Sequence, residues 1–146
     1  MIYSDLVKKA CLISFEAHKD DRDKGGYPYV YHPFYLASQF NDENCVCVAF
    51  LHDVIEDHGD RFSFSSLKDD GFGGDILDAL RLLTHKSGVD YMEYVKAIAA
   101  NPIARKVKMA DLLHNMDSSR NNGTLPPKIE LYKEAYKYLA AIEEEK

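Results

Sequence analysis

Residues 49–58 read Ala-Phe-Leu-His-Asp-Val-Ile-Glu-Asp-His. The apolar side chains of this stretch recur at the three- and four-residue spacing of a core helix. Five polar or ionisable side chains interrupt them, and on a continuous helix four of these would share one arc of roughly 140°. The four are His52, Asp53, Glu56 and Asp57. We therefore expect a polar face within a buried helix.

A metal ion would explain this polar face. Carboxylates and imidazoles that gather in a buried element repel one another or lose solvation unless a cation compensates them. The pattern thus predicts a metal site with His52 and Asp53 as the natural ligands. A core histidine beside a solvated acidic face is the alternative interpretation, and it would suffice for a lone His-Asp pair.

Two other segments offer partners for this pair. His32 precedes Pro33, which we expect at the first position of a helix, where its fixed φ sets the entry of the chain. Asp111 shares one helix face with Lys108 and Asn115 through i, i+3 and i+4 spacing. Taken alone, that face would be an exposed polar stripe.

The same helical period runs through most of the chain, and Gly, Pro and Asn residues punctuate it. We expect an all-α fold of about seven or eight helices in one domain, residues 1–146. The stretch 27–31 is short and contains Pro28, so we interpret it as an extended loop. The expected helices cover residues 4–20, 33–40, 43–57, 64–69, 74–84, 90–99, 103–118 and 127–144.

Composition excludes several classes of protein. A length of 146 residues fits one core, and no apolar run approaches the roughly 20 residues of a membrane helix. The formal charge of −6 repels nucleic-acid polymers, so neither these nor a membrane is an expected partner. Asp5 and two lysines interrupt any signal peptide, which predicts a cytoplasmic protein. The three cysteines lack CxxC spacing, which argues against a disulfide framework or a thiolate zinc site.

The order His32-Pro33, His52-Asp53, Asp111 resembles the HD-domain superfamily of metal phosphohydrolases. Within that superfamily, three segments are similar to the alarmone hydrolase domain of the RelA/SpoT group. They are Gly-Tyr-Pro-Tyr-Val-Tyr-His-Pro at 26–33, Leu-His-Asp-Val-Ile-Glu-Asp at 51–57 and Lys-Met-Ala-Asp-Leu-Leu-His-Asn-Met at 108–116. The resemblance covers roughly residues 10–120 and extends to short stand-alone relatives.

The resemblance implies one divalent ion and a ligand set. The ligands would be His32, His52, Asp53 and Asp111. Two imidazoles and two carboxylates suit Mn²⁺, Fe²⁺ or Zn²⁺, and the resemblance points to Mn²⁺.

The resemblance also implies that the pair after His52-Asp53 is catalytic. Glu56 and Asp57 would orient or deprotonate the attacking water and manage proton transfer to the leaving group.

Substrate contacts are expected from the loop 20–26 and from Asn115. Lys24 best matches the basic position of the family. Arg22 is a second candidate, although the loop carries one extra residue and an exposed charge is the alternative interpretation. Glycines in this loop would permit close backbone approach to phosphate. Asn115 would contact the nucleoside or, alternatively, form hydrogen bonds within its helix.

The remaining histidines and tyrosines are expected to have structural roles. His18, His85 and His114 would be structural or would support the ligands, and His58 is assigned no role. The tyrosines of the stretch 27–31 would pack the loop.

The expected function is guanosine-3′,5′-bis(diphosphate) 3′-pyrophosphohydrolase, acting on a small nucleotide and releasing pyrophosphate. An HD-domain phosphohydrolase acting on another nucleotide or phosphoester is the first alternative. Two departures from the family pattern favour it, Leu112 in place of a basic residue and His58 in place of a small hydroxyl residue. A metal-dependent nucleotide sensor without turnover is the second alternative, and intact Glu56-Asp57 argues against it. We expect no synthetase domain within these 146 residues, and the oligomeric state is left open.

Overall fold

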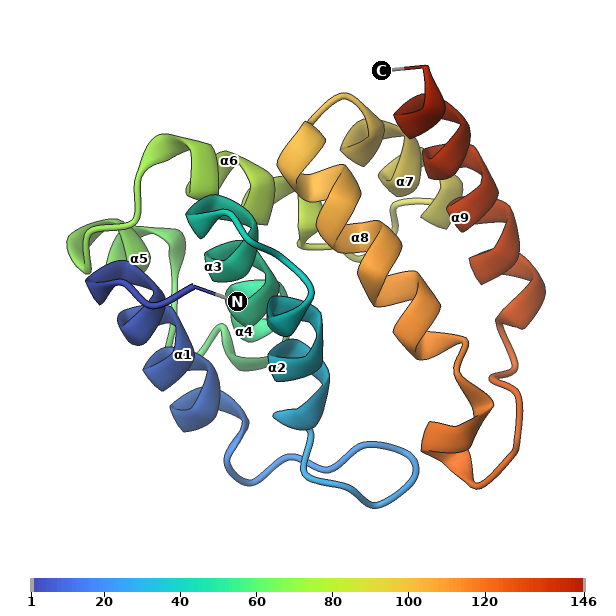
Figure 1. The fold of residues 1–146 in the computed structure, drawn as a ribbon, viewed down its shortest axis with the longest axis horizontal. Helices are drawn as coiled ribbons and strands as arrows, with labels where there is room; N and C mark the ends of the chain where they lie inside the picture. Colours follow the sequence, from blue (N-terminus) through green and yellow to red (C-terminus); the bar gives the residue numbers. More distant parts are fainter. Residues whose placement is uncertain (1, 146) are drawn as a thin grey trace.

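The computed structural model describes residues 2–145, which form helices and connecting loops (Figure 1). This confirms the expected all-α class. One isolated β-bridge joins Arg22 to Pro28. Among the described residues the elements are α1 (Asp5–His18), α2 (Tyr31–Ser38), α3 (Glu43–Leu51), α4 (Val54–His58), α5 (Phe64–Asp69), α6 (Gly74–Leu83), α7 (Tyr91–Ala99), α8 (Pro102–Asn115), the 3₁₀ helix η1 (Ser118–Asn121) and α9 (Ile129–Glu144).

Helix α3 is the central element of the core. It packs against α1, α2, α6 and α8, and every residue from 45 to 51 is buried. A helix that is apolar on all sides can be stable only where neighbours cover all of them. Helices α7 and α9 pack on α8, so they lie on the far side of α8 from α1 and α2 (Figure 1).

The predicted helix 43–57 is wrong in one respect, because it is two helices. Helix α3 ends at Leu51, and α4 begins at Val54. Asp53 between them has φ −108° and ψ −3°, which depart from the values of a regular helix, and its carbonyl accepts the first hydrogen bond of α4 from the Asp57 N–H at 2.9 Å. The argument from one continuous helical arc therefore fails, since His52 and Asp53 lie at a junction between helices.

The expected position of Pro33 is also wrong. Helix α2 begins at Tyr31, so Pro33 is its third residue rather than its first. The first four N–H groups of a helix have no partner within it, and a proline is therefore tolerated anywhere in this first turn. The earlier start places His32 inside the helix, where it is buried.

Several other boundaries differ at the ends. The segment expected over 103–118 ends at Asn115, and a 3₁₀ turn follows after Asp117, whose side chain accepts from the Ser119 N–H. Asn122, with φ 55°, closes that turn in the left-handed region that asparagine tolerates. The expected loop 27–31 is a loop over 27–30, whereas Tyr31 is the first residue of α2. Within residues 2–145, no helix has the length and apolar content to cross a membrane.

Candidate metal centre

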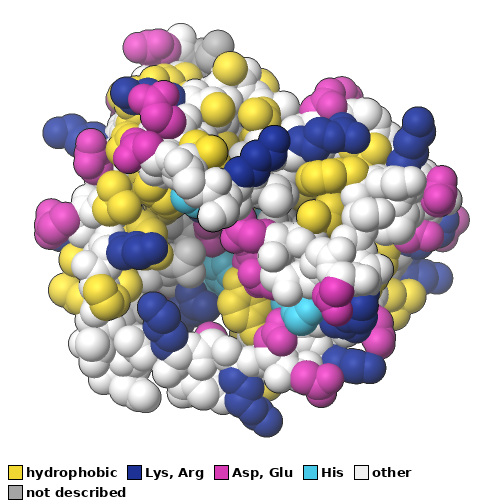
Figure 2. All heavy atoms as spheres, turned by 180° about the vertical axis from the view of Figure 1, so that it is seen from behind, with side chains coloured by type: hydrophobic (Ala, Val, Ile, Leu, Met, Phe, Trp, Pro, Cys, Tyr) yellow, Lys and Arg dark blue, Asp and Glu magenta, His cyan; other side chains and the backbone are white. Residues whose placement is uncertain are grey.

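Three separate elements bring the four predicted ligands together. His32 comes from α2, His52 and Asp53 from the α3–α4 junction, and Asp111 from α8. His32 Nε2 lies 2.8 Å from Asp111 Oδ1, and His52 Nε2 lies 3.0 Å from Asp53 Oδ2 and 3.6 Å from Asp111 Oδ1. His32, His52 and Asp111 are buried, and Asp53 is half-buried. Figure 2 shows a hollow on the back of the molecule where acidic and histidine side chains gather.

His52 provides the observation that favours a cation. Its Nδ1 is 2.7 Å from the Ala49 carbonyl oxygen, so Nδ1 carries the proton and donates it. Its Nε2 is buried without a hydrogen-bond partner and faces the two carboxylates. Burial acts to lower the pKa of His52, yet Asp53 and Asp111 hold that pKa well above the ordinary histidine value. The cluster thus attracts positive charge to Nε2, from a proton or from a metal ion.

His114 supports His32 from the opposite side of the ring. The two Nδ1 atoms are 2.7 Å apart and the rings stack with centroids 5.0 Å apart. Burial, and then the charge of Arg120, lower the pKa of His114 to about 4, so His114 is neutral near neutral pH and its Nδ1 can accept. A proton on His32 Nδ1 leaves His32 Nε2 free to bind a metal, which is the usual arrangement of a ligating histidine.

Asp111 is held by two further residues of α8. Lys108 Nζ lies 2.9 Å from Oδ2, and Asn115 Nδ2 donates to Oδ1 at 3.0 Å. Burial acts to raise the pKa of Asp111, whereas Lys108 and the two histidines hold it well below the ordinary value. Asn115 therefore makes the hydrogen bond within its helix that was the alternative to a nucleoside contact.

Tyr29 is a member of the site that sequence reasoning assigned to packing. Its hydroxyl donates to Asp53 Oδ2, and its ring contacts His32 and His18 with centroids 5.7 and 4.8 Å away. Burial, followed by the charge of Asp53, raises the pKa of Tyr29, so the hydroxyl stays protonated. No spacing rule links a loop tyrosine to an aspartate 24 positions later, and the sequence carried no signal for this contact.

Glu56 and Asp57 lie on α4, directly after the ligand pair, and both side chains reach solvent. Partial burial nevertheless raises the pKa of Glu56 and raises the pKa of Asp57 to about 6. The negative charge of Asp53 raises both pKa values further. Glu56 Oε1 accepts from the His85 backbone N–H at 2.6 Å. Two carboxylates with raised pKa values thus border the cluster.

A cavity of about 270 Å³ lies beside the cluster. The loop between α1 and α2 forms one wall with Arg22 and Lys24, the two predicted phosphate contacts, and Asn115 and Tyr29 form another. Several lining residues were missed in the sequence, among them Arg120 from η1 and Tyr132 from α9, because neither belongs to a recognised motif.

The glycines of the loop also have a structural role, beside the expected one of approaching phosphate. A Cβ at Gly25 would lie 2.0 Å from the backbone oxygen of Arg120, so only glycine allows the loop to approach η1 this closely. Gly26 has φ +88°, a conformation that other residues rarely adopt. Arg120 continues the contact, with Nη2 3.8 Å from Asp23 Oδ2. The glycines thus allow the loop to turn and to pack against η1.

Comparisons with known proteins bear on the family. No family model matches the chain. A probable GTP pyrophosphokinase from Mycobacterium leprae is 29% identical over 135 residues, which are 84% of this chain and 16% of that protein. A guanosine-3′,5′-bis(diphosphate) 3′-pyrophosphohydrolase from Haemophilus influenzae is 30% identical over 131 residues, 80% of this chain and 18% of that protein. The chain therefore spans less than a fifth of the length of these curated relatives.

A solved structure extends the likeness to the fold. It is described as a metazoan orthologue of SpoT that hydrolyses ppGpp, and it superposes with a TM-score of 0.75 at 22% identity. The match covers 97% of this chain and 87% of that one. Sequence relatives and fold agree with the resemblance expected from the three motifs, and the chain is a homologue of the RelA/SpoT group of (p)ppGpp synthetases and hydrolases.

Proposed function

We propose that this chain is a metal-dependent phosphohydrolase that removes the 3′-diphosphate of guanosine 3′,5′-bis(diphosphate) as pyrophosphate. The observation that carries the proposal is the buried, unpartnered Nε2 of His52, which faces Asp53 and Asp111 in a cluster built from three elements. Relatives that bear the name of this hydrolase supply the substrate class.

The donor set fits a divalent metal. His32, His52, Asp53 and Asp111 would hold the ion, and two imidazoles with two carboxylates suit Mn²⁺, Fe²⁺ or Zn²⁺. We propose Mn²⁺ among these. When bound, such an ion supplies Lewis-acid polarisation of a phosphate and activation of water.

Glu56 and Asp57 would carry out the two proton transfers of the reaction. A carboxylate with a pKa of about 6 is largely ionised near neutral pH and basic enough to accept a proton, so Asp57 would take one from the attacking water. Glu56, whose pKa is also raised, would carry a proton to the 3′-oxygen as the bond from that oxygen to phosphorus breaks. The His85 N–H holds Glu56 Oε1 in place and leaves Oε2 for this transfer.

Substrate binding would use the cavity beside the cluster. Arg22 and Lys24 offer two cations to the 5′-diphosphate, and Arg120 and Tyr132 add a third cation and a ring. Asn115 also lines the cavity, and its amide oxygen accepts from Arg120 at 3.2 Å. A small nucleotide is therefore the proposed partner, whereas the cytoplasmic location and the absence of polymer and membrane partners stay predictions.

One observation favours the alternative of an HD-type hydrolase for another nucleotide or phosphoester. Leu112, at the position where the family carries a basic residue, is fully buried in the core. The cavity therefore receives no charge from this position.

The deciding experiment incubates the Mn²⁺-loaded protein with guanosine tetraphosphate and, separately, with simple nucleotides. We expect pyrophosphate release from the tetraphosphate and a loss of about 10²-fold or more in Glu56→Gln. Hydrolysis of simple nucleotides alone would overturn the substrate. Metal-dependent nucleotide binding with no hydrolysis of any phosphate ester would instead support a sensor.

A further inference from the structure

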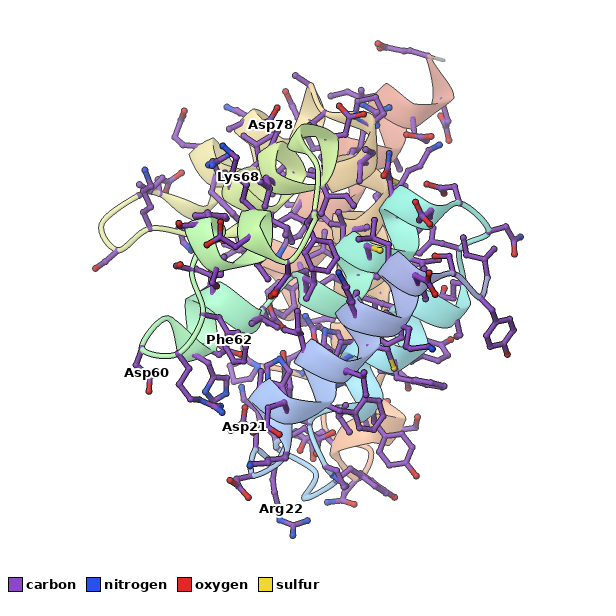
Figure 3. All side chains as sticks on the ribbon, turned by 90° about the vertical axis from the view of Figure 1, so that its left-hand side faces the viewer. Asp21, Arg22, Asp60, Phe62, Lys68 and Asp78 are labelled. Carbon is purple, nitrogen blue, oxygen red and sulfur yellow. The ribbon has the colours of Figure 1, made fainter. Side chains whose placement is uncertain are left out.

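A second group of ionisable side chains lies outside the candidate metal centre. Asp21 Oδ2 is 2.9 Å from His18 Nδ1 and 2.6 Å from His58 Nε2. His18 is the last residue of α1, and His58 is the last residue of α4, directly after Glu56 and Asp57. Asp21 begins the loop that carries Arg22 and Lys24. Figure 3 shows Asp21 at the end of α1 and Arg22 pointing away from the helices.

The hydrogen bonds around His58 determine where its proton sits. Arg61 Nη2 donates to the Ala17 carbonyl oxygen at 2.8 Å and lies 3.3 Å from His58 Nδ1. An arginine can only donate, so Nδ1 accepts and Nε2 carries the proton that is given to Asp21. His58 therefore has a hydrogen-bond partner at each ring nitrogen, whereas His18 Nε2 is buried without one.

Asp21 also closes the base of the loop through its backbone. Its carbonyl oxygen accepts from the Tyr29 N–H at 2.9 Å. One step further along, the Asp23 N–H donates to the Tyr27 carbonyl oxygen at 2.8 Å. Both ends of the loop are therefore held at Asp21, and its side chain is the link from that base to α4.

We propose that His58 and Asp21 are positioning residues that hold the loop carrying Arg22 and Lys24 in register with Glu56 and Asp57. The inference rests on the proposed function, because it assigns the loop to substrate binding. His58 takes the place of the family's small hydroxyl residue, and its longer side chain spans the distance to Asp21. Loss of the link releases Arg22 and Lys24 and leaves the proposed metal ligands untouched.

Proteolysis tests the link without reference to any activity. Arg22 and Lys24 are exposed sites for trypsin within the loop. We expect His58→Ala and Asp21→Asn to speed native-state cleavage after these residues about tenfold, the effect of losing one hydrogen bond to a charged group. His58→Gln should restore slow cleavage, because its amide nitrogen lies near the position of Nε2. Asp78→Asn is the matched control, since Asp78 makes an exposed ion pair with Arg81 on α6.

Kinetics test the consequence for substrate. For hydrolysis of guanosine tetraphosphate we expect His58→Ala to raise KM about tenfold and to change kcat less than about threefold, with KM restored in His58→Gln. Cleavage and KM at wild-type values in His58→Ala would overturn the proposal. So would a second equivalent of Zn²⁺ that binds the wild type and is lost in His58→Ala. If the wild type hydrolysed no nucleotide, the proposed function would fail. Trypsin cleavage would still test whether the contact between His58 and Asp21 holds the loop.

Discussion

Two groups of histidine and aspartate flank Tyr29, and they differ in the charge around their histidines. On one side, His52 Nε2 has no hydrogen-bond partner and faces two carboxylates. On the other, a single carboxylate, Asp21, accepts from both histidines, and Arg61 donates to the second ring nitrogen of His58. His18 Nε2 is also buried without a partner, so an unpartnered ring nitrogen does not distinguish the groups. The number of carboxylates does, because a metal ion fits best where an unused lone pair lies among several negative charges.

A matched pair of substitutions gives the largest test of this difference. Asp111→Asn should abolish binding of the divalent ion and lower hydrolysis by on the order of 10³-fold, because the several kcal/mol that a catalytic metal supplies are lost. Asp21→Asn should leave the metal content unchanged. Metal content by elemental analysis and hydrolysis rates check both. Equal metal loss in the two variants would erase the distinction between the groups.

Asp57 should affect both the rate of hydrolysis and the free energy of unfolding. Asp57→Asn should lower hydrolysis about 10²-fold. In wild type, activity should rise with pH as the carboxyl ionises around pH 6. A retained rate in Asp57→Asn would remove this residue from the proton transfer.

The same raised pKa has a consequence for folding. The folded, metal-free protein binds a proton at Asp57 that the unfolded chain has released between pH 3.8 and about 6. The free energy of unfolding contributed by Asp57 therefore falls as pH rises through that window. Chelator-treated Asp57→Asn should resist denaturant better than wild type at pH 7 and no better below pH 3.8. Equal differences at both pH values would show that its pKa is not raised.

His114 tests the hydrogen bond behind the metal ligand. His114→Ala should weaken divalent-ion affinity about 10- to 100-fold, because His32 loses the acceptor that sets its tautomer. His114→Asn should restore part of the affinity, since its amide oxygen lies near the position of Nδ1. Calorimetric titration with Mn²⁺ measures both, and an unchanged affinity in His114→Ala would show that His32 needs no such support.

Arg61 gives the smallest expected effect. Arg61→Gln leaves His58 and Asp21 in place and weakens the donor that selects the His58 tautomer, together with the hydrogen bond to the Ala17 carbonyl oxygen. We expect KM for guanosine tetraphosphate to rise about two- to threefold, with metal content unchanged. A KM change as large as that of His58→Ala would mean that Arg61, rather than Asp21, carries the link to the loop.

The helices and the clustering of the four proposed ligands could both be predicted from the sequence, for different reasons. Helical periodicity is local, so α1, α5, α6 and α7 appear close to their expected bounds. The ligands came from the order of three short motifs, which the resemblance assembled into one site. The break between α3 and α4 was missed, because the Val54 and Ile55 positions continue the apolar pattern straight through it.

What the sequence by itself determined is therefore the all-helical class, the residues of the polar segment and their kinship to one family of proteins. Only the tertiary structure decided that Tyr29 donates to Asp53 across 24 positions, that His114 contacts His32, and that His58 contacts Asp21. The physical reason is the separation in sequence between the residues that make each contact. Backbone hydrogen bonds within a helix join residues four apart and leave a pattern in the sequence, whereas a contact between distant side chains depends on how the helices pack.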